Sequence, residues 1–300
     1  TEYGGTTPAV SEPFGMTQWC AATRVNGISR TMYHHADTTS IGFMATHQPA
    51  IWMGDYGFMT LMPQSGSLKI AADERRTAFD RADEVARPYY YRVTYGGEGI
   101  TTELTATSRA SFFRIGYPAD RKAILYLEAG RNGDGGSGHI EIFPDRREVH
   151  IWNSEVHDAL KFSAALEEYG TWSGTRIDAG QSEAEGPQVG GYVVFPAGTV
   201  QVELRIGSSF IGFGQAADNM ERELAPSFRR TVGRVRGEWN RMLSKVRLYG
   251  AGDDDRTIFY TAFFRTLQFP REFSEYGRYY SPFDGRIHDG YGKVYNRAMA

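Results

Sequence analysis

The hydrophobic pattern of this sequence changes its period near residue 210, and that change restricts the folds open to the chain. Residues 200–206 alternate apolar with polar side chains, which is typical of a strand with one buried and one exposed face. Further predicted strands lie at 89–95, 101–107, 111–117, 139–143, 149–152 and 191–195. Many short strands at regular spacing predict a β-sandwich, here of about 200 residues.

Beyond residue 210 the apolar residues recur three or four positions apart, as they do on one face of a helix. Three helices are predicted, at 215–224, 227–246 and 255–269. Pro226 and Pro270 follow the first and the third, because proline cannot continue a helix. One helix and a loop cannot form a domain. We therefore expect the apolar faces of the last two helices to need partners outside this sequence, or else to expose a patch that drives association.

The expected fold class is therefore mainly β. We predict a large antiparallel β-sandwich over residues 1–212, a helical linker over 213–250 and the incomplete start of a helical domain over 251–300.

Composition excludes several classes of partner. The formal net charge is −3 with no basic stripe, so neither nucleic acid nor an anionic membrane surface is expected. No apolar run is long enough to span a membrane. Cys20 is the only cysteine, which precludes an internal disulfide and a zinc site built on several cysteines. Because the sequence starts at Thr1 and shows no signal peptide, we expect a mature or trimmed chain.

The strongest candidate for function is the stretch 42–63, GFMATHQPAIWMGDYGFMTLMP. Glycines and Pro49 interrupt any regular element there, which predicts a loop delivered by a strand. An indole face covers the apolar face of a sugar ring while neighbouring polar groups bind its hydroxyls, so His47, Trp52 and Asp55 form a candidate sugar site. A purely structural role is the alternative for each of the three residues. His47 need not touch a ligand, Trp52 can be packed in the core, and Asp55 can cap a turn.

Other motifs fail. Residues 133–138 match the dinucleotide pattern G-x-G-x-x-G, but the run after them predicts a strand instead of the required helix, so we expect a hairpin loop. No nucleophile elbow, H-E-x-x-H motif or phosphate loop occurs. A glycosidase needs two carboxylates across the scissile bond. No such pair is marked by spacing, and Asp284 and Asp289 are not taken as acid and base.

Several spaced motifs together resemble the N-terminal part of glycoside hydrolase family 92. The first group comprises Gly5-x-x-Pro8, Pro13-Phe14-Gly15-Met16, Thr46-His47-Gln48-Pro49, Trp52 and Gly54-Asp55-Tyr56-Gly57. The later group comprises Ser208-Ser209-Phe210, Ala217-x-Asn219, Trp239, Phe259-Tyr260-Thr261-Ala262, Pro270, Phe273-Ser274-Glu275, Gly277-Arg278-Tyr279-Tyr280 and Asp284-Gly285-x-Ile287-His288. Their agreement in order across the chain makes the resemblance specific.

The resemblance implies a calcium-dependent, inverting, exo-acting α-mannosidase in which a β-sandwich, a helical linker and an (α/α)6 barrel enclose the site. The substrate would be a mannose-containing oligosaccharide, with α-1,2 linkages of N-glycans or mannan the commonest target. In this sequence His47, Trp52 and Asp55 would contact the terminal mannose, with Arg24 a weaker candidate. The general acid Glu, the base carboxylate and the calcium ligands are expected beyond residue 300.

No catalytic or metal-binding residue is therefore assigned within the sequence, and the 300 residues alone are expected to be inactive without the missing C-terminal catalytic domain. The resemblance implies a secreted or periplasmic location. The alternative is a non-catalytic carbohydrate-binding β-sandwich, which would bind mannosides without hydrolysing them. A third class, a structural or interaction domain, would do neither.

Overall fold

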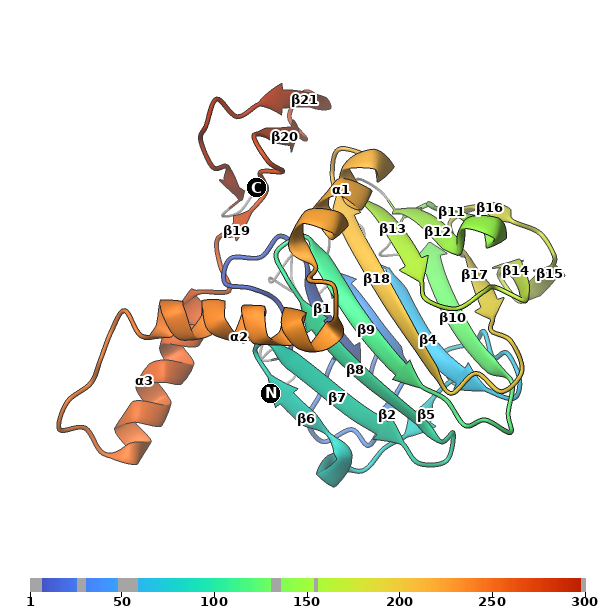
Figure 1. Cartoon of the computed structure of the whole chain (residues 1–300), viewed down its shortest axis with the longest axis horizontal. Coiled ribbons are helices and arrows are strands. Elements are labelled where there is room, and N and C mark those ends of the chain that lie inside the picture. The colour runs from blue at the N-terminus through green and yellow to red at the C-terminus, as the bar shows by residue number, and fades with distance from the viewer. Residues whose placement is uncertain (1–6, 26–30, 48–58, 131–135, 154–155, 298–300) are drawn as a thin grey trace.

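The computed structural model describes residues 7–25, 31–47, 59–130, 136–153 and 156–297 (Figure 1). Two large antiparallel sheets dominate these ranges, and three α-helices follow them in the sequence. The predicted fold class, a mainly β chain with a large antiparallel β-sandwich followed by helices, is confirmed.

Within the described residues, the first sheet has seven strands. Their spatial order is β1 (Gln18–Ala22), β3 (Gly42–Thr46), β4 (Thr60–Ser65), β10 (Ala123–Gly130), β17 (Val189–Val194), β14 (Glu168–Ser173) and β15 (Arg176–Ala179).

The second sheet has nine strands in the same described ranges. Their order is β16 (Glu183–Gly186), β11 (Gly138–Phe143), β12 (Glu148–Asn153), β13 (Val156–Phe162), β18 (Gln201–Ser209), β9 (Ala110–Gly116), β8 (Ile100–Ala106), β7 (Tyr90–Tyr95) and β6 (Val85–Arg87). Two 3₁₀ turns, η1 (Arg81–Asp83) and η2 (Pro144–Arg146), and the small pair β2 (Thr39–Ser40) with β5 (Thr77–Ala78) connect these elements.

The core lies between the two sheets. Alternate side chains of each strand point inward, as the period of two requires, and their burial provides the main driving force for folding. Trp19 and Phe43 of the first sheet both meet Phe113 of the second edge to face, at ring-centroid distances of 4.9 and 5.7 Å. Phe43 also meets Tyr91 at 6.0 Å. These contacts fix how the sheets face each other.

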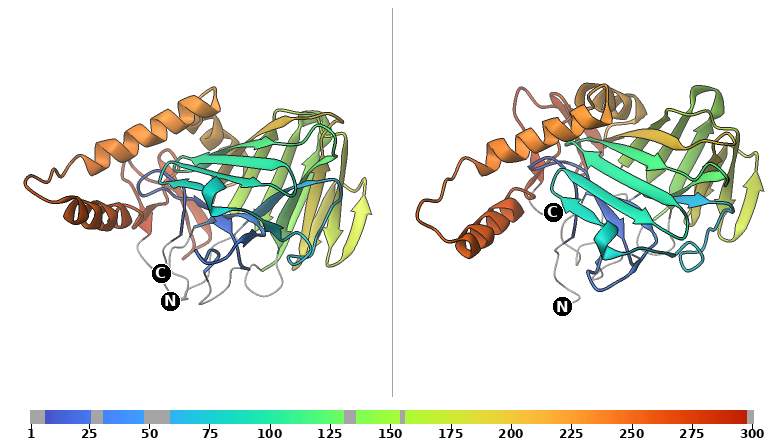
Figure 2. Two further views of the ribbon diagram at one scale, coloured as in Figure 1. Left: turned by 90° about the horizontal axis from the view of Figure 1, so that it is seen from below. Right: turned by 60° about the horizontal axis from the view of Figure 1, so that its bottom comes forward.

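Two helices cover the outside of the nine-stranded sheet (Figure 2). Helix α1 (Phe213–Glu223) lies against β18 and β13, and α2 (Phe228–Leu243) lies against β8 and β9. The approach of α1 depends on Gly207 of β18. An ideal Cβ built on Gly207 would lie only 1.9 Å from the carbonyl oxygen of Ala216, so a larger residue would push the helix away.

The two later helices differ in how much of their surface is buried. The expectation that the 227–246 helix needs a partner outside the sequence is wrong, because this chain itself covers the apolar face of α2. Phe228 packs on the sandwich, whereas Val235 and Trp239 pack in a cluster that also includes Phe263 and Phe264 of the third helix. The indole nitrogen of Trp239 also donates to the carbonyl oxygen of Ser11 at 2.7 Å. Helix α3 (Asp253–Thr266) has no buried residue, and Ile258 is 68% exposed.

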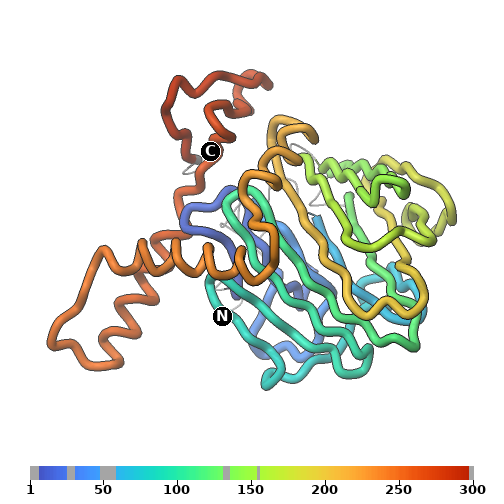
Figure 3. The backbone as a smooth tube through the Cα atoms, viewed as in Figure 1, coloured from blue at the N-terminus to red at the C-terminus, as the bar shows by residue number. Residues whose placement is uncertain are grey.

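The chain after α3 turns back toward the sandwich (Figure 3). It forms two short antiparallel pairs, β19 (Arg271–Glu272) with β22 (Asn296–Arg297) and β20 (Arg278–Ser281) with β21 (Arg286–Asp289). In the part of the chain that the structure describes, each helix is too short or too polar to cross a membrane.

The close approach at Gly207 leads to a stability prediction. We expect Gly207→Ala to lower the free energy of unfolding by roughly 2–4 kcal/mol, because the new methyl group meets backbone atoms that cannot move aside. Gly233→Ala is the matched control, since Gly233 lies exposed inside α2 with no atom within 4 Å of its ideal Cβ. It should gain about 0.5–1 kcal/mol from helix propensity. Urea unfolding of both variants checks this, and equal stability of the two would contradict it.

Candidate functional site

The end of β3 meets the segment that follows α3. Arg271, which is 1% exposed, donates from Nη1 to the carbonyl oxygen of Thr46 at 2.7 Å and from Nη2 to Oε1 of Gln18 at 2.9 Å. Gln18 and Thr46 are paired across β1 and β3. A single buried guanidinium thus ties the last residues of β3, where the candidate loop begins, to a segment more than 220 positions later.

His47 lies in an aromatic cluster at this junction. Its ring meets Phe210 edge to face at 5.5 Å, and Phe210 meets Phe273 at 4.9 Å. The side chain of His47 is 1% exposed. The structure therefore places His47 beside the junction, packed under aromatic rings. Its predicted contact with a ligand stays a prediction.

Glu275 anchors the same segment to β18 and α1. Its Oε1 accepts from the backbone N–H of Phe210 at 2.9 Å, and its Oε2 accepts from Nδ2 of Asn219 at 2.8 Å. Asn219 also donates to the carbonyl oxygen of Ser208 at 2.8 Å. Burial raises the pKa of Glu275, while these hydrogen bonds oppose the shift. Both oxygens of the Glu275 carboxylate therefore accept hydrogen bonds from within this chain, and the group has a structural role.

A second buried cluster surrounds Arg109 and Glu223, which are 7% and 6% exposed. Arg109 pairs through Nη1 with Oε1 of Glu223 at 2.8 Å, and its Nε donates to the carbonyl oxygen of Ser274 at 2.7 Å. The other oxygen of Glu223 accepts from Oγ1 of Thr107 at 2.6 Å and from the backbone N–H of Arg109 at 2.8 Å. The hydroxyl of Tyr276 donates to Oε1 of Glu223 at 3.1 Å. This cluster fixes residues 274–276 to the turn between β8 and β9 and to the end of α1.

Beside this cluster lies a cavity of about 540 Å³ with a strongly charged lining. Its walls include Glu12, Arg109, Glu223, Arg234 and Glu272. Burial, reinforced by the charge of Glu223, raises the pKa of Glu12 to about 7. The lining contains both Glu side chains and Arg or Lys side chains in nearly equal numbers, so its charge does not favour an anion over a cation.

Asp158 is a buried acid next to Ser208, close to the junction. It lies on β13 with 1% exposure, and Oγ of Ser208 donates to its Oδ1 at 2.6 Å. Burial raises the pKa of Asp158 to about 7. The group is therefore largely neutral in the folded protein below that pH.

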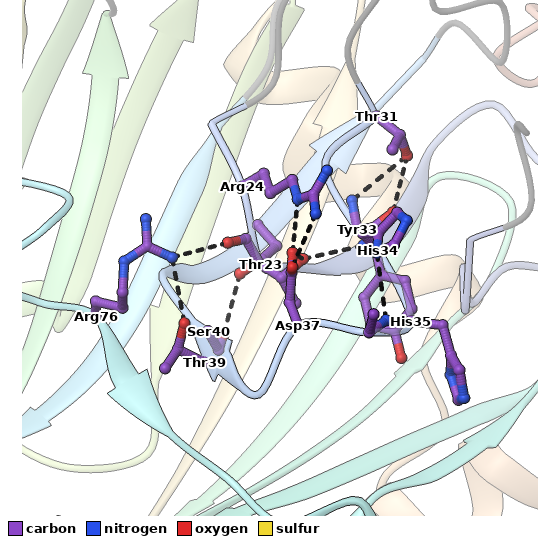
Figure 4. Close-up of polar contacts among 12 residues, drawn as sticks. Thr23, Arg24, Thr31, Tyr33, His34, His35, Asp37, Thr39, Ser40 and Arg76 are labelled. Atoms are coloured by element: carbon purple, nitrogen blue, oxygen red, sulfur yellow. Dashed lines mark hydrogen bonds and ion pairs between the residues drawn. The ribbon is translucent and has the colours of Figure 1, made fainter. Parts of the chain in front are cut away.

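Arg24 lies at the opposite end of β1 from this junction. The register pairs Gln18 with Thr46 and Ala22 with Gly42, so the chain beyond Ala22 leads away from His47. Nε and Nη2 of Arg24 donate to the two carboxylate oxygens of Asp37 at 2.7 and 2.9 Å (Figure 4). These bonds hold the pKa of Asp37 below its ordinary value. The structure thus separates Arg24 from His47, and its role in sugar binding stays a prediction.

Two of the four predicted site residues, Trp52 and Asp55, lie outside the described residues. Within the described ranges, no group of three or more His, Cys, Asp or Glu side chains is placed to hold a metal ion. Calcium accordingly stays a prediction. The structure also identifies residues that the motif analysis did not select, namely Arg271, Glu275 and Asn219. Glu275 and Asn219 belong to motifs of the family resemblance, so that signal was present in the sequence without a role attached to it.

The buried acid leads to a prediction about pH. Between about pH 4 and pH 7 the unfolded chain has released the Asp158 proton that the folded protein still holds. The stabilising contribution of this group is full below that window and is lost as pH rises through it, by on the order of 1.4 kcal/mol per pH unit. Asp158→Asn keeps an acceptor for Ser208 but cannot ionise. Urea unfolding from pH 4.5 to 8 should show the unaltered protein losing stability relative to the variant, and parallel profiles would exclude the effect.

The Arg109 cluster leads to a second prediction. Arg109→Met leaves Glu223 buried without its cation, so the free energy of unfolding should fall by roughly 3–5 kcal/mol. The control is Arg241→Met, because Arg241 forms an exposed pair with Glu238 one helical turn away and should cost less than about 0.5 kcal/mol. Chemical denaturation compares the two, and a small loss in Arg109→Met would show that the buried pair contributes little.

Two profiles of known protein families match this chain, one over the sandwich and one over the residues after it. The profile of the Glycosyl hydrolase family 92 N-terminal domain matches residues 1–209. The profile of the Glycosyl hydrolase family 92 catalytic domain matches residues 215–299. A search of curated proteins found no match.

Solved structures agree with this assignment. A family GH92 inverting mannosidase from Bacteroides thetaiotaomicron VPI-5482 is 36% identical, with a TM-score of 0.88 over 96% of this chain and 40% of that one. A second GH92 α-mannosidase from the same species, also solved with mannoimidazole, is 21% identical, with a TM-score of 0.87 over 98% of this chain and 43% of that one. At that identity the second match supports the fold alone. This chain spans about 40% of the length of these structures. The match of the N-terminal profile across most of the sequence, together with the 36% identity, shows that the chain belongs to glycosyl hydrolase family 92.

Proposed function

We propose that the complete protein is an inverting, exo-acting α-mannosidase, and that this chain supplies one wall of its mannose pocket. The observation that carries the proposal is the likeness, over nearly the whole chain, to an inverting mannosidase of the same family. The junction of β3 with residues 271–275 supports the location, because it joins the sandwich to the part of the chain that matches the catalytic domain.

Inversion requires a general acid on one side of the scissile bond and a base that activates water on the other. Glu223, Glu275 and Asp158 are buried carboxyl groups near the junction, and each is hydrogen-bonded to other parts of this chain. The family resemblance implies that the acid and the base lie outside these 300 residues, and the internal hydrogen bonds of these three groups are consistent with that assignment. The role of the present chain is to bind and orient the terminal sugar. Excluding water there strengthens the polar contacts that the transition state needs.

The remaining expectations follow from the family resemblance. We propose α-1,2-linked mannose of N-glycans or mannan as the substrate, and a secreted or periplasmic location. Calcium is the expected cofactor, and no step proposed for these residues depends on it.

The first test follows sugar release by the complete protein from α-1,2-mannobiose, using proton NMR to identify the anomer. Inversion predicts that β-mannose appears first and then equilibrates with the α form. Release of α-mannose first would contradict inversion. Binding of the disaccharide without any release would instead support the non-catalytic sugar-binding alternative.

A second prediction concerns the candidate loop. Trp52→Ala in the complete protein should lower kcat/KM for the disaccharide by at least about tenfold, because a sugar ring loses its stacking surface. Phe143→Ala is the control, since Phe143 is a partly exposed aromatic residue at the far end of β11 from the junction. Steady-state kinetics measure kcat/KM of both variants, and only Trp52→Ala should show the loss. Unchanged turnover in Trp52→Ala would remove Trp52 from the site.

A further inference from the structure

The outer face of the seven-stranded sheet holds a second cavity, of about 450 Å³, that the proposed mannose pocket does not use. Tyr126 and Glu128 alternate with Leu125 and Leu127 along β10 and so lie on the outer face of the sheet, where they are 1% and 6% exposed. The segment 68–75 crosses over this face and closes one side. The side chains that matter here are Ile70, Arg75, Tyr126, Glu128, Trp172 and Ile177.

The floor of this cavity is built around Trp172 of β14. The ideal Cβ of Gly190, its neighbour on β17, would lie 2.5 Å from the indole, so glycine is required for the ring to lie across that strand. The ring stacks on Tyr126 with a centroid distance of 5.4 Å and an angle of 12°. The indole nitrogen donates to the carbonyl oxygen of Leu127 at 3.1 Å, which fixes the orientation. The two rings are only 1% and 2% exposed, so they form a rigid, packed base beneath the cavity.

A charged pair lies beside the aromatic floor. Arg75 is 4% exposed, and its guanidinium lies 4.4 Å from the centroid of the Tyr126 ring. Its Nε donates to the carbonyl oxygen of Ile41 at 3.0 Å, and its Nη2 lies 3.7 Å from Oε2 of Glu128. Its Nη1 also donates to the carbonyl oxygen of Ile70 and to the hydroxyl of Tyr126, so the guanidinium fixes the segment 68–75 to the sheet and shapes the cavity wall. At the mouth, Ile177 is 47% exposed and the polar side chain of Gln188 is also exposed.

This lining selects a class of ligand. The cavity contains Arg75 with Glu74 and Glu128, so its lining does not favour an anion such as a phosphate. A purely apolar ligand would bury the exposed polar side chains of Glu74, Thr175 and Gln188 without replacing their hydrogen bonds to water, which is costly. A neutral ring with one apolar face and several hydroxyls matches this lining, with the apolar face on Ile70 and Ile177 and the hydroxyls on the exposed side chains of Glu74, Thr175 and Gln188.

The strand register gives the distance to the candidate site. Outward-facing positions run in one row from Met44 on β3 through Thr60, Glu128 and Gly190 to Trp172 on β14. Four strand spacings separate β3 from β14, which amounts to roughly 20 Å. Both locations therefore lie on the same sheet, within the span of a short oligosaccharide.

We propose that this cavity binds a hexopyranose unit of a glycan, as a subsite distant from the catalytic pocket that holds a longer chain while its end is cleaved. The choice of mannose as the sugar rests on the proposed function, whereas the existence of the site does not.

The direct test is methyl NMR on the complete protein with isoleucine labels, titrated with D-mannose. Mannose is the product, so the enzyme does not consume it and the test works even if hydrolysis fails. The Ile70 and Ile177 methyl signals should shift and saturate, while that of the exposed Ile258 on α3 should not. Ile177→Glu should abolish the shift at Ile70, and Val200→Glu, at another exposed apolar position, should not. No saturable shift at Ile70, or one unchanged by Ile177→Glu, would overturn the proposal.

A kinetic test separates this subsite from the catalytic pocket. Ile177→Glu should lower kcat/KM for polymeric α-mannan by about tenfold, because the second contact no longer raises the local concentration of chain ends. The same variant should leave kcat/KM for α-1,2-mannobiose unchanged. An equal loss on both substrates, or no loss on mannan, would overturn the distant subsite.

Discussion

Two buried arginines hold the chain after α3 against the end of the sandwich, and the arrangement of the candidate site depends on them. Arg271 reaches back to Thr46 and Gln18, and Arg109 binds the backbone of residue 274 together with Glu223. Buried charges are costly to desolvate unless they are paired and hydrogen-bonded, and a pair that loses one partner is strongly destabilised. These contacts therefore favour one docking geometry over near alternatives. The catalytic-domain profile matches residues 215–299, so these contacts also join that part of the chain to the sandwich.

The outer faces of the two sheets are covered differently. The nine-stranded sheet carries α1 and α2 on its outer face, and Gly207 and Trp239 fix how closely they approach. The seven-stranded sheet leaves part of its outer face for a cavity with an aromatic and charged lining. In both cases a glycine in a strand makes room for a neighbour. Gly207 lets Ala216 of helix α1 approach the nine-stranded sheet, and Gly190 makes room for the Trp172 ring on the seven-stranded sheet. Rigid strands position such side chains more accurately than loops can.

Much of the architecture could be predicted from the sequence, because it follows from local periodicity. The alternation in residues 200–206 reports a strand buried on one face, and the structure places β18 there. The three- and four-residue spacing after residue 210 reports helices, and the structure forms α1, α2 and α3. The spaced motifs also indicated the family, since a sequence carries its ancestry independently of any geometry.

Other features required the tertiary structure, because they join residues far apart in the chain. Periodicity showed that the 227–246 helix has an apolar face, but not that β8, β9 and α3 cover it. His47 and Arg24 looked like members of one site, yet the antiparallel register of β1 and β3 sends them to opposite ends of the same strand pair. The roles of Arg271, Glu275 and Trp172 depend on atoms contributed by strands distant in sequence. The sequence alone determined the elements, their order and the family, whereas only folding decided which side chains meet, because no local pattern encodes contacts across two sheets.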